Sequence, residues 1–152
     1  MKITTHSARK TKKTASILAE AILESKTKEP VVIGLVGDLG SGKTTFVQGL
    51  ARGLGIKRSV TSPTFLIIRR YPLPTTHYSH LFHIDAYRLK SSKELSALGF
   101  KKIISDSKNI VVIEWADKIK KILPKQMVWI NFKHGKKENE RVIEFKSGTQ
   151  NA

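Results

Sequence analysis

The sequence of 152 residues lacks cysteine altogether and is short of acidic and aromatic side chains. The lack of cysteine excludes a disulfide scaffold, a thiolate nucleophile and a zinc or iron–sulfur site built on thiolates. No apolar run approaches the roughly 18 residues that a membrane-spanning helix needs, and the first residues form no apolar signal segment. These absences predict a cytoplasmic protein with no membrane contact, in which any metal ion is held by oxygen atoms.

Only 12 aspartate and glutamate residues oppose 28 lysine and arginine residues, so the formal net charge is +16. Such an excess has three interpretations: a nucleic-acid footprint, a docking face for an acidic partner, or general use of lysine on the surface. Aromatic residues make up 7% of the chain, which is little for a platform that stacks bases. The charge alone therefore does not identify a partner.

The length and the apolar content predict a single domain. A chain of this size hides roughly 70% of its unfolded surface, enough for one core and too little for two. Hydrophobic residues make up 39% of the sequence, which is ample to fill that core. We expect one domain over residues 1–146 and a flexible tail over residues 147–152.

Hydrophobic spacing predicts strands that alternate with helices. Residues 31–36 form a continuous apolar run, typical of a parallel strand buried on both faces, and 110–113 form another. A helix is predicted at 45–54. The other predicted elements are a helix at 8–24 capped by Ser7, a short helix from the capping box at 91–94 to Gly99, a short basic helix ending near 122, and two hairpins, 65–71 with 78–85 and 127–132 with 141–145. The pattern favours a three-layer α/β fold with a mixed, mostly parallel sheet and helices on both faces.

A glycine-rich segment lies between the first buried strand and the next helix. Residues 37–44 read G-D-L-G-S-G-K-T, which fits the pattern G-x-x-x-x-G-K-[ST] of a phosphate-binding loop. Its glycines allow backbone N–H groups to point at phosphate oxygens, and the helix adds its positive N-terminal end. We expect Lys43 to reach the phosphates and the Thr44 hydroxyl to bind Mg²⁺. The N-K-x-D signature of guanine recognition is absent, so ATP is the expected nucleotide.

Two acidic residues end predicted strands. Glu114 follows the buried run at 110–113, and Asp85 ends the run at 81–84. A Mg²⁺–nucleotide site needs a carboxylate near the metal, and such groups lie at the carboxyl ends of neighbouring strands. We therefore expect Glu114 near the metal and Asp85 close by. Strand alternation places His83 on the same side as Asp85, although a lone histidine is more often packed in a core.

The chain carries four segments in a fixed order: residues 37–46, Ser62-Pro63-Thr64-Phe65, the run H-I-D-A-Y-R-L at 83–89, and the run V-I-E-W at 112–115. Together they resemble the TsaE family, small bacterial ATPases required for N6-threonylcarbamoyladenosine formation in tRNA. The likeness extends from Thr5 to about Phe145. It implies a P-loop NTPase fold that hydrolyses ATP with Mg²⁺ and acts on TsaD-type and TsaB-type partners, which it resets between cycles. Contact with tRNA would then be indirect.

The resemblance also assigns site residues by position. It implies that Thr44 and Glu114 bind Mg²⁺ and that Asp85 acts on the attacking water, so that Lys43, Asp85 and Glu114 are the expected catalytic residues. Residues 62–64 correspond to a switch segment. Ser7 and Thr11 lie in a segment that closes over the adenine, and Arg141 matches a family arginine only after a gap. The expected nucleotide contacts are Ser7, Thr11, Asp38, Leu39, Gly40, Ser41, Gly42, Lys43, Thr44, Thr45, Thr64, Trp115 and Arg141.

Two other functions stay open from the sequence. A small-molecule or nucleoside kinase shares the loop but needs an acceptor pocket and a cationic lid, for which Arg69, Arg70 and Arg88 are candidates. A basic RNA-binding module with a vestigial loop would explain the charge, although no RNA-recognition signature is present. The ATPase is favoured because Lys43, Thr44 and Glu114 are all in place.

Overall fold

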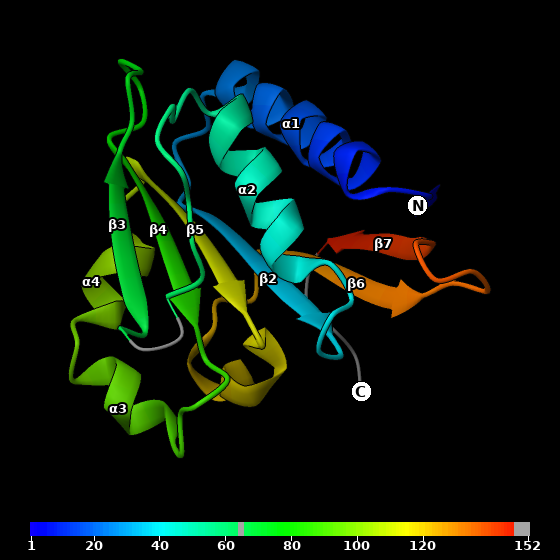
Figure 1. The fold of residues 1–152 in the computed structure, drawn as a ribbon. Helices are drawn as coiled ribbons and strands as arrows, with labels where there is room; N and C mark the ends of the chain where they lie inside the picture. The colour runs from blue at the N-terminus through cyan, green and yellow to red at the C-terminus, as the bar shows by residue number, and fades with distance from the viewer. Residues whose placement is uncertain (64–65, 148–152) are drawn as a thin grey trace.

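The computed structural model of the chain, which describes residues 1–63 and 66–147, is a sheet with helices on both faces (Figure 1). In that part of the chain seven strands lie in the order β1-β7-β6-β2-β5-β4-β3. Their bounds are β1 Lys2–Thr5, β2 Val31–Gly37, β3 Ile68–Pro72, β4 His80–Asp85, β5 Asn109–Glu114, β6 Val128–His134 and β7 Arg141–Ser147. The helices are α1 Ala8–Ser25, α2 Lys43–Gly53, α3 Ser92–Ser96, α4 Phe100–Ser105 and the 3-10 helix η1 Ala116–Ile122. The predicted α/β architecture is confirmed.

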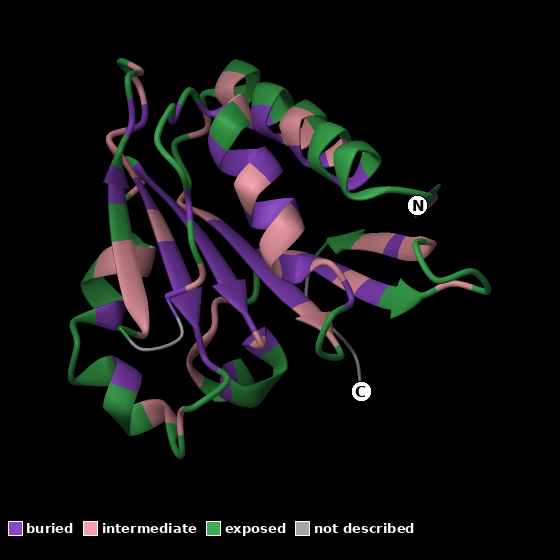
Figure 2. Cartoon of the chain, viewed as in Figure 1, coloured by how far each residue is buried: buried purple, intermediate pink, exposed green. Residues whose placement is uncertain are grey.

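The four central strands, β6, β2, β5 and β4, run parallel. Strands β3 and β7 pair antiparallel with β4 and β6, and β1 pairs antiparallel with β7 at the outer edge. Every residue of β5 is buried, as expected for a strand in the middle of a covered sheet (Figure 2). The carboxyl ends of the four parallel strands meet at one edge of the sheet, where ligands bind in open α/β folds.

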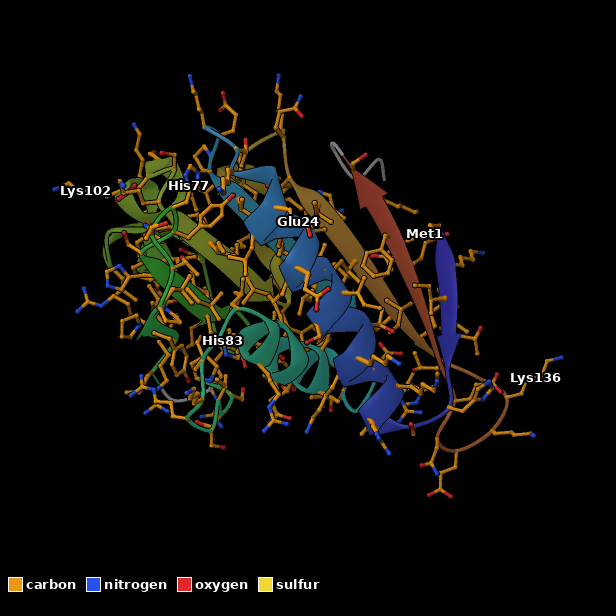
Figure 3. The ribbon with its side chains drawn as sticks, turned by 90° about the horizontal axis from the view of Figure 1, so that it is seen from above. Met1, Glu24, His77, His83, Lys102 and Lys136 are labelled. Atoms are coloured by element: carbon orange, nitrogen blue, oxygen red, sulfur yellow. The ribbon has the colours of Figure 1, made fainter. Side chains whose placement is uncertain are left out.

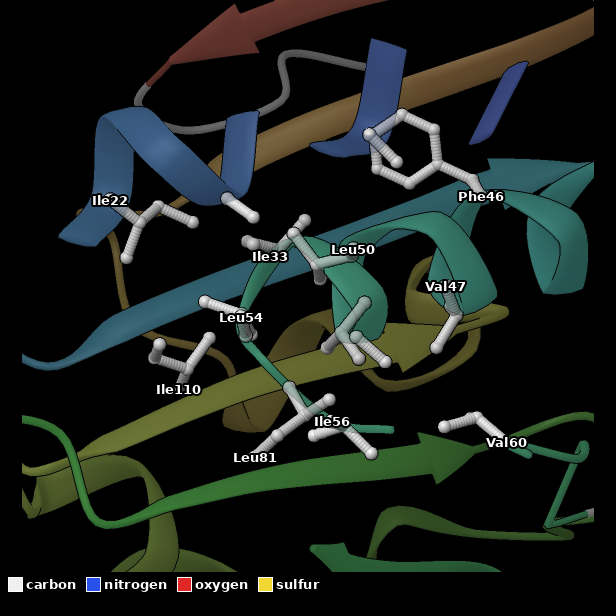
Figure 4. Close-up of a cluster of buried hydrophobic side chains, with 14 of the residues drawn as sticks. Ile22, Ile33, Phe46, Val47, Leu50, Leu54, Ile56, Val60, Leu81 and Ile110 are labelled. Carbon is white, nitrogen blue, oxygen red and sulfur yellow. The ribbon is translucent and has the colours of Figure 1, made fainter. Parts of the chain in front are cut away.

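Two apolar clusters fill the space between the layers. Helices α1 and α2 cover one face of the sheet, and the larger cluster beneath them includes Leu50, Leu54, Ile56 and Val60 (Figure 4). On the opposite face, side chains of α3, α4 and η1 pack against Val111 and Ile113 of β5, with contributions from Leu95, Phe100 and Ile119. In the described part of the chain, no helix combines the length and the apolar character that a membrane crossing requires.

Two glycines of α2 set the distance between α1 and α2. A Cβ atom on Gly49 would collide with the carbonyl oxygen of Lys12, and one on Gly53 would lie 2.6 Å from the Cβ of Ala19. Because both α2 residues lack side chains, the two helices approach each other more closely than larger residues would permit.

Most predicted elements are present, with small shifts at their ends. The predicted helix at 8–24 is α1, and Ser7 caps it by accepting a hydrogen bond from the Lys10 N–H at 3.1 Å. The helix predicted at 45–54 begins earlier, at Lys43, because Gly42 in a left-handed conformation is its cap. Both predicted hairpins exist, as β3 with β4 and β6 with β7.

Two elements, β1 and α4, were not predicted from the sequence. Strand β1 is four residues of mixed polarity that pair only with β7, and α4 begins directly after Gly99, the glycine at which we expected the helical segment to stop. The predicted tail, residues 147–152, lies outside the described residues except for Ser147, the last residue of β7.

Candidate nucleotide-binding site

The loop between β2 and α2 turns tightly into the helix. Gly40 and Gly42 have φ angles of 75° and 105°, which side chains rarely adopt. The Ser41 N–H donates a hydrogen bond to the carbonyl oxygen of Asp38 at 3.1 Å, so the turn closes on itself. Since the first N–H groups of a helix have no partner within the helix, the loop and α2 together present donors suited to an anion.

Lys43 opens α2 and is only 5% exposed. Its ammonium group donates hydrogen bonds to the carbonyl oxygens of Gly37 and Asp38 at 2.5 and 2.8 Å and lies 4.3 Å from the ring centroid of Trp115. Burial lowers the pKa of Lys43 below its ordinary value, and nearby carboxylates, Glu114 foremost, oppose that shift. The site thus holds a partly dehydrated cation whose charge its surroundings leave only partly balanced.

Three side chains form a hydrogen-bonded chain from α2 to the neighbouring strands. The Thr44 hydroxyl donates to Oε1 of Glu114 at 2.9 Å, and Nε2 of His83 contacts Oε2 of the same carboxylate at 2.6 Å. Both His83 and Glu114 are buried, and in the top view of Figure 3 His83 lies inside the molecule beside α2. Each oxygen of the Glu114 carboxylate therefore has its own protein partner, which fixes its orientation.

Asp85 ends β4 directly opposite Glu114 in the parallel register of β4 and β5. Its carboxylate accepts hydrogen bonds from the Ser62 hydroxyl at 3.2 Å and from the Tyr87 N–H at 2.9 Å. The structure therefore brings the second predicted acid to the same edge as the first. It also joins that acid to the 62–64 segment, as far as this segment is described.

A cavity of about 440 Å³ connects these groups. Trp115 directly follows β5 with a φ of 60°, and its ring centroid lies 4.9 Å from that of Tyr87. The Lys118 ammonium lies 4.8 Å from the centroid of the Tyr87 ring. Tyr87 and Trp115 thus form an aromatic side of the cavity. The predicted residues that line the cavity are Ser7, Thr11, Leu39, Gly40, Gly42, Lys43, Thr44, Thr45, Ser62, Asp85, Glu114, Trp115 and Arg141.

Two further predicted nucleotide contacts, Thr11 and Arg141, come from distant parts of the chain. Thr11 is 2% exposed, and its hydroxyl is hydrogen bonded to that of Thr5 at 2.8 Å. Arg141 of β7 donates to the carbonyl oxygen of Gly40 at 3.1 Å, which ties the last hairpin to the glycine loop. Both residues line the same cavity as the glycine loop, and their contact with a nucleotide stays a prediction.

Two of the predicted contacts, Asp38 and Ser41, do not line the cavity. Asp38 is exposed beside the loop, and Ser41 is buried beneath it, with its hydroxyl 3.4 Å from the Lys43 ammonium. Thr64 lies outside the described residues.

Sequence reasoning missed several residues of the site. Tyr87 and Asn139 line the cavity, and Arg88 lines it where we had considered it only for a kinase lid. Only Tyr87 and Arg88 gave a local signal, since they follow Asp85 in the run 83–89. Asn139 reaches the cavity through the turn between β6 and β7, a placement that depends on the whole sheet.

The chain matches a known protein family over most of its length. A sequence model described as threonylcarbamoyl adenosine biosynthesis protein TsaE matches residues 5–143. The chain belongs to the TsaE family. A Bacillus subtilis TsaE protein is 41% identical over 117 residues, which are 75% of this chain and 68% of that protein. A Rickettsia typhi TsaE protein is 32% identical over 131 residues, 86% of this chain and 84% of that protein. Both are named tRNA threonylcarbamoyladenosine biosynthesis protein TsaE.

The fold agrees with the TsaE assignment. The crystal structure of Bacillus subtilis YdiB aligns with a TM-score of 0.68 at 31% sequence identity, covering 98% of this chain and 86% of that one. The predicted P-loop fold and the predicted membership of the TsaE family are both confirmed. The four segments that suggested TsaE meet around one cavity, insofar as they are described.

Proposed function

We propose that this chain binds ATP with Mg²⁺ in the 440 Å³ cavity and hydrolyses the nucleotide. The observation that carries the proposal is the hydrogen bond of 2.9 Å between Thr44 and Glu114. It joins a hydroxyl of the phosphate-binding loop to a carboxylate at the end of a neighbouring parallel strand. These are the two protein groups that a P-loop NTPase uses to hold its metal ion.

The oxygen donors suit Mg²⁺ held jointly by protein and nucleotide. In residues 1–63 and 66–147 no cluster of three or more histidine, aspartate or glutamate side chains could hold a metal by itself. Mg²⁺ is usually bound by one or two protein groups, with waters and phosphate oxygens completing its shell. Thr44 Oγ1 and Glu114 Oε1 would be those protein ligands. The ion would supply positive charge to the phosphate oxygens.

The other side chains take roles that follow from their positions. Lys43 would turn from the Gly37 and Asp38 carbonyls to the phosphates, where a partly dehydrated ammonium interacts strongly with anionic oxygen. Asp85, held by Ser62 and by the Tyr87 N–H, would orient the attacking water and accept its proton.

The remaining contacts would hold the rest of the nucleotide. Trp115 would contact the nucleotide beside Lys43. Ser7, Thr11 and Arg141 would lie along the remaining part of the nucleotide. Thr64 belongs to the proposed switch segment.

We infer an accessory role in N6-threonylcarbamoyladenosine formation in tRNA. The support is membership of the TsaE family and the names of the relatives described above. The partners we propose are TsaD-type and TsaB-type proteins, whose complex would be reset by ATP turnover. The chemistry of the transferred group would then belong to the partners.

A kinase is less well supported. Of the three arginines considered for a cationic lid, only Arg88 lines the cavity. Arg69 instead donates a hydrogen bond to the Thr61 hydroxyl at 2.9 Å. Of the arginines considered for the lid that would enclose a transferred phosphoryl group, one therefore remains.

The deciding experiment is phosphate release from ATP with and without the purified TsaB-type and TsaD-type proteins of the same organism. We expect release that depends on Mg²⁺ and rises strongly when both partners are present, with chelator and partner-only reactions as controls. A phosphorylated small molecule formed in step with ADP would instead establish a kinase. Failure to bind ATP would show that the phosphate-binding loop is vestigial.

A further inference from the structure

A second, basic cavity lies next to the nucleotide cavity. It has a volume of about 290 Å³, and its polar lining consists of Lys12, Gln48, Arg52, Lys57, Arg58 and Ser59, a set we call the basic pocket. Its cations come from α1, from α2 and from the loop after α2, and no carboxylate lines it. Neither the ATP site nor its proposed catalysis uses any of these residues.

The loop that carries Lys57 and Arg58 is anchored to the core at both ends. Ile56 and Val60 are 7% and 5% exposed and pack into the larger apolar cluster, as Figure 4 shows. The residues between them are therefore pushed outward, and Lys57, Arg58 and Ser59 are all exposed. The Arg58 guanidinium also lies 4.7 Å from the ring centroid of the buried Tyr71, which fixes its place at the wall.

Among the described residues, no carboxylate pairs with any of the four cations of the basic pocket. Within residues 1–63 and 66–147, the ion pairs involve Lys2, His6, His83 and Lys146, and none involves Lys12, Arg52, Lys57 or Arg58. Like charges that gather around one hollow repel each other and create a positive potential there. An anionic ligand with several charges would relieve that repulsion.

We propose that the basic pocket binds the phosphodiester backbone of an RNA strand. Lysine and arginine supply the charge for phosphate contacts, and the Ser59 hydroxyl can bond to phosphate or sugar oxygens. The pocket presents no exposed aromatic ring on which a base could stack, which favours backbone over base recognition. A net charge of +16 adds long-range attraction for a polyanion, and the relatives are named for a tRNA modification.

This binding site goes beyond the proposed ATPase and does not depend on it. It adjoins the nucleotide cavity, because Lys12 follows Thr11 on α1 and Gln48 lies one turn beyond Thr45 on α2. The Gln48 amide also donates to the carbonyl oxygen of Val60 at 3.2 Å, which ties α2 to the loop. RNA and nucleotide would thus lie beside each other along the same short stretch of two helices.

The test is binding of a fluorescein-labelled, unmodified tRNA transcript without nucleotide. The pocket variant is Lys12→Ala/Arg52→Ala/Lys57→Ala. The matched control, Lys101→Ala/Lys102→Ala/Lys121→Ala, removes the same charge from exposed positions on the other face of the sheet, where α4 and η1 lie (Figure 1; Figure 3 labels Lys102). We expect the pocket variant to raise the Kd at least about 30-fold and the control less than about threefold. A plot of the logarithm of the association constant against the logarithm of the salt concentration should be less steep for the pocket variant, its slope being smaller in magnitude by about 2 to 2.7.

Three results would overturn the proposal. Equal losses in both triple variants would show diffuse attraction, and absence of tRNA binding by the parent chain would remove the site altogether. Tighter, variant-sensitive binding of a polyglutamate peptide would assign the pocket to an acidic protein. Thermal unfolding checks both variants. If the triple variant does not fold, Arg52→Gln/Lys57→Gln against Lys101→Gln/Lys102→Gln makes the same comparison.

Discussion

The nucleotide cavity and the basic pocket lie against the same two helices but differ in the burial and pairing of their polar side chains. In the cavity, buried groups bind one another: Thr44 and His83 hold the two oxygens of Glu114. In the basic pocket, Arg52 and Lys57 are exposed, and neither forms an ion pair in the described residues. A buried polar group without a partner is costly, whereas an exposed one is hydrated. Substitutions in the cavity should therefore disturb chemistry and folding, and those in the pocket should affect binding alone.

The largest effect is expected from Lys43→Ala. It removes the only cation that the described residues bury in the cavity wall, so phosphate release should fall at least about 100-fold. Lys102→Ala, which removes an exposed lysine of α4, should leave the rate unchanged. Phosphate release measured at saturating ATP and Mg²⁺ checks both variants. An active Lys43→Ala enzyme would remove the contrast between the two sites.

Glu114→Gln should act on the metal. The amide keeps the shape of the side chain and can still accept from Thr44, but it lacks the negative charge that attracts Mg²⁺. The Mg²⁺ concentration for half-maximal phosphate release should rise at least about tenfold. The measurement is a Mg²⁺ titration at fixed ATP, accompanied by thermal unfolding. An unchanged titration with a lowered unfolding midpoint would make Glu114 a structural residue.

His83→Phe should act on folding. The ring volume is retained, but Oε2 of the buried Glu114 carboxylate loses its donor. Such a loss lowers the free energy of unfolding by about 1–3 kcal/mol. Urea denaturation of the single variants and of His83→Phe/Glu114→Gln measures the coupling, which should be clearly non-additive because the two side chains are in contact. Additive effects would mean that the contact contributes nothing.

Arg52→Ala/Lys57→Ala should have the smallest effect on stability. Both side chains are exposed and form no ion pair in the described residues, so the free energy of unfolding should change by less than about 0.5 kcal/mol. Urea denaturation at the same pH and salt measures the change. A loss above 1 kcal/mol would show that the pocket, like the cavity, is part of the folded framework.

The parts of the site that depend on neighbours in sequence could be predicted. The strand, glycine loop and helix of residues 31–53 are contiguous, so their pattern indicated both the fold and the phosphate site. The contact of His83 with Glu114 could not be foreseen, because it requires β4 to lie beside β5 in one particular register. Strand β1 was missed for the same reason, since its partner β7 is at the other end of the chain.

The basic pocket shows a different limit of sequence reasoning. Runs of lysine and arginine stand out at 9–13, 118–125 and 133–137. The pocket instead gathers four cations from three segments, and of these only Lys12 belongs to one of those runs. Charge density along a sequence therefore does not show where charge gathers in space.

The absence of a side chain at Gly49 affects the shape of both sites, because it sets the spacing of α1 and α2. Any side chain there would meet the main chain of Lys12 and would act as a wedge between α1 and α2. Lys12 belongs to the wall of the basic pocket and Thr11 to that of the nucleotide cavity, while α2 supplies Gln48 to one and Thr45 to the other. A single Cβ atom at position 49 would thus widen the nucleotide cavity and the basic pocket together.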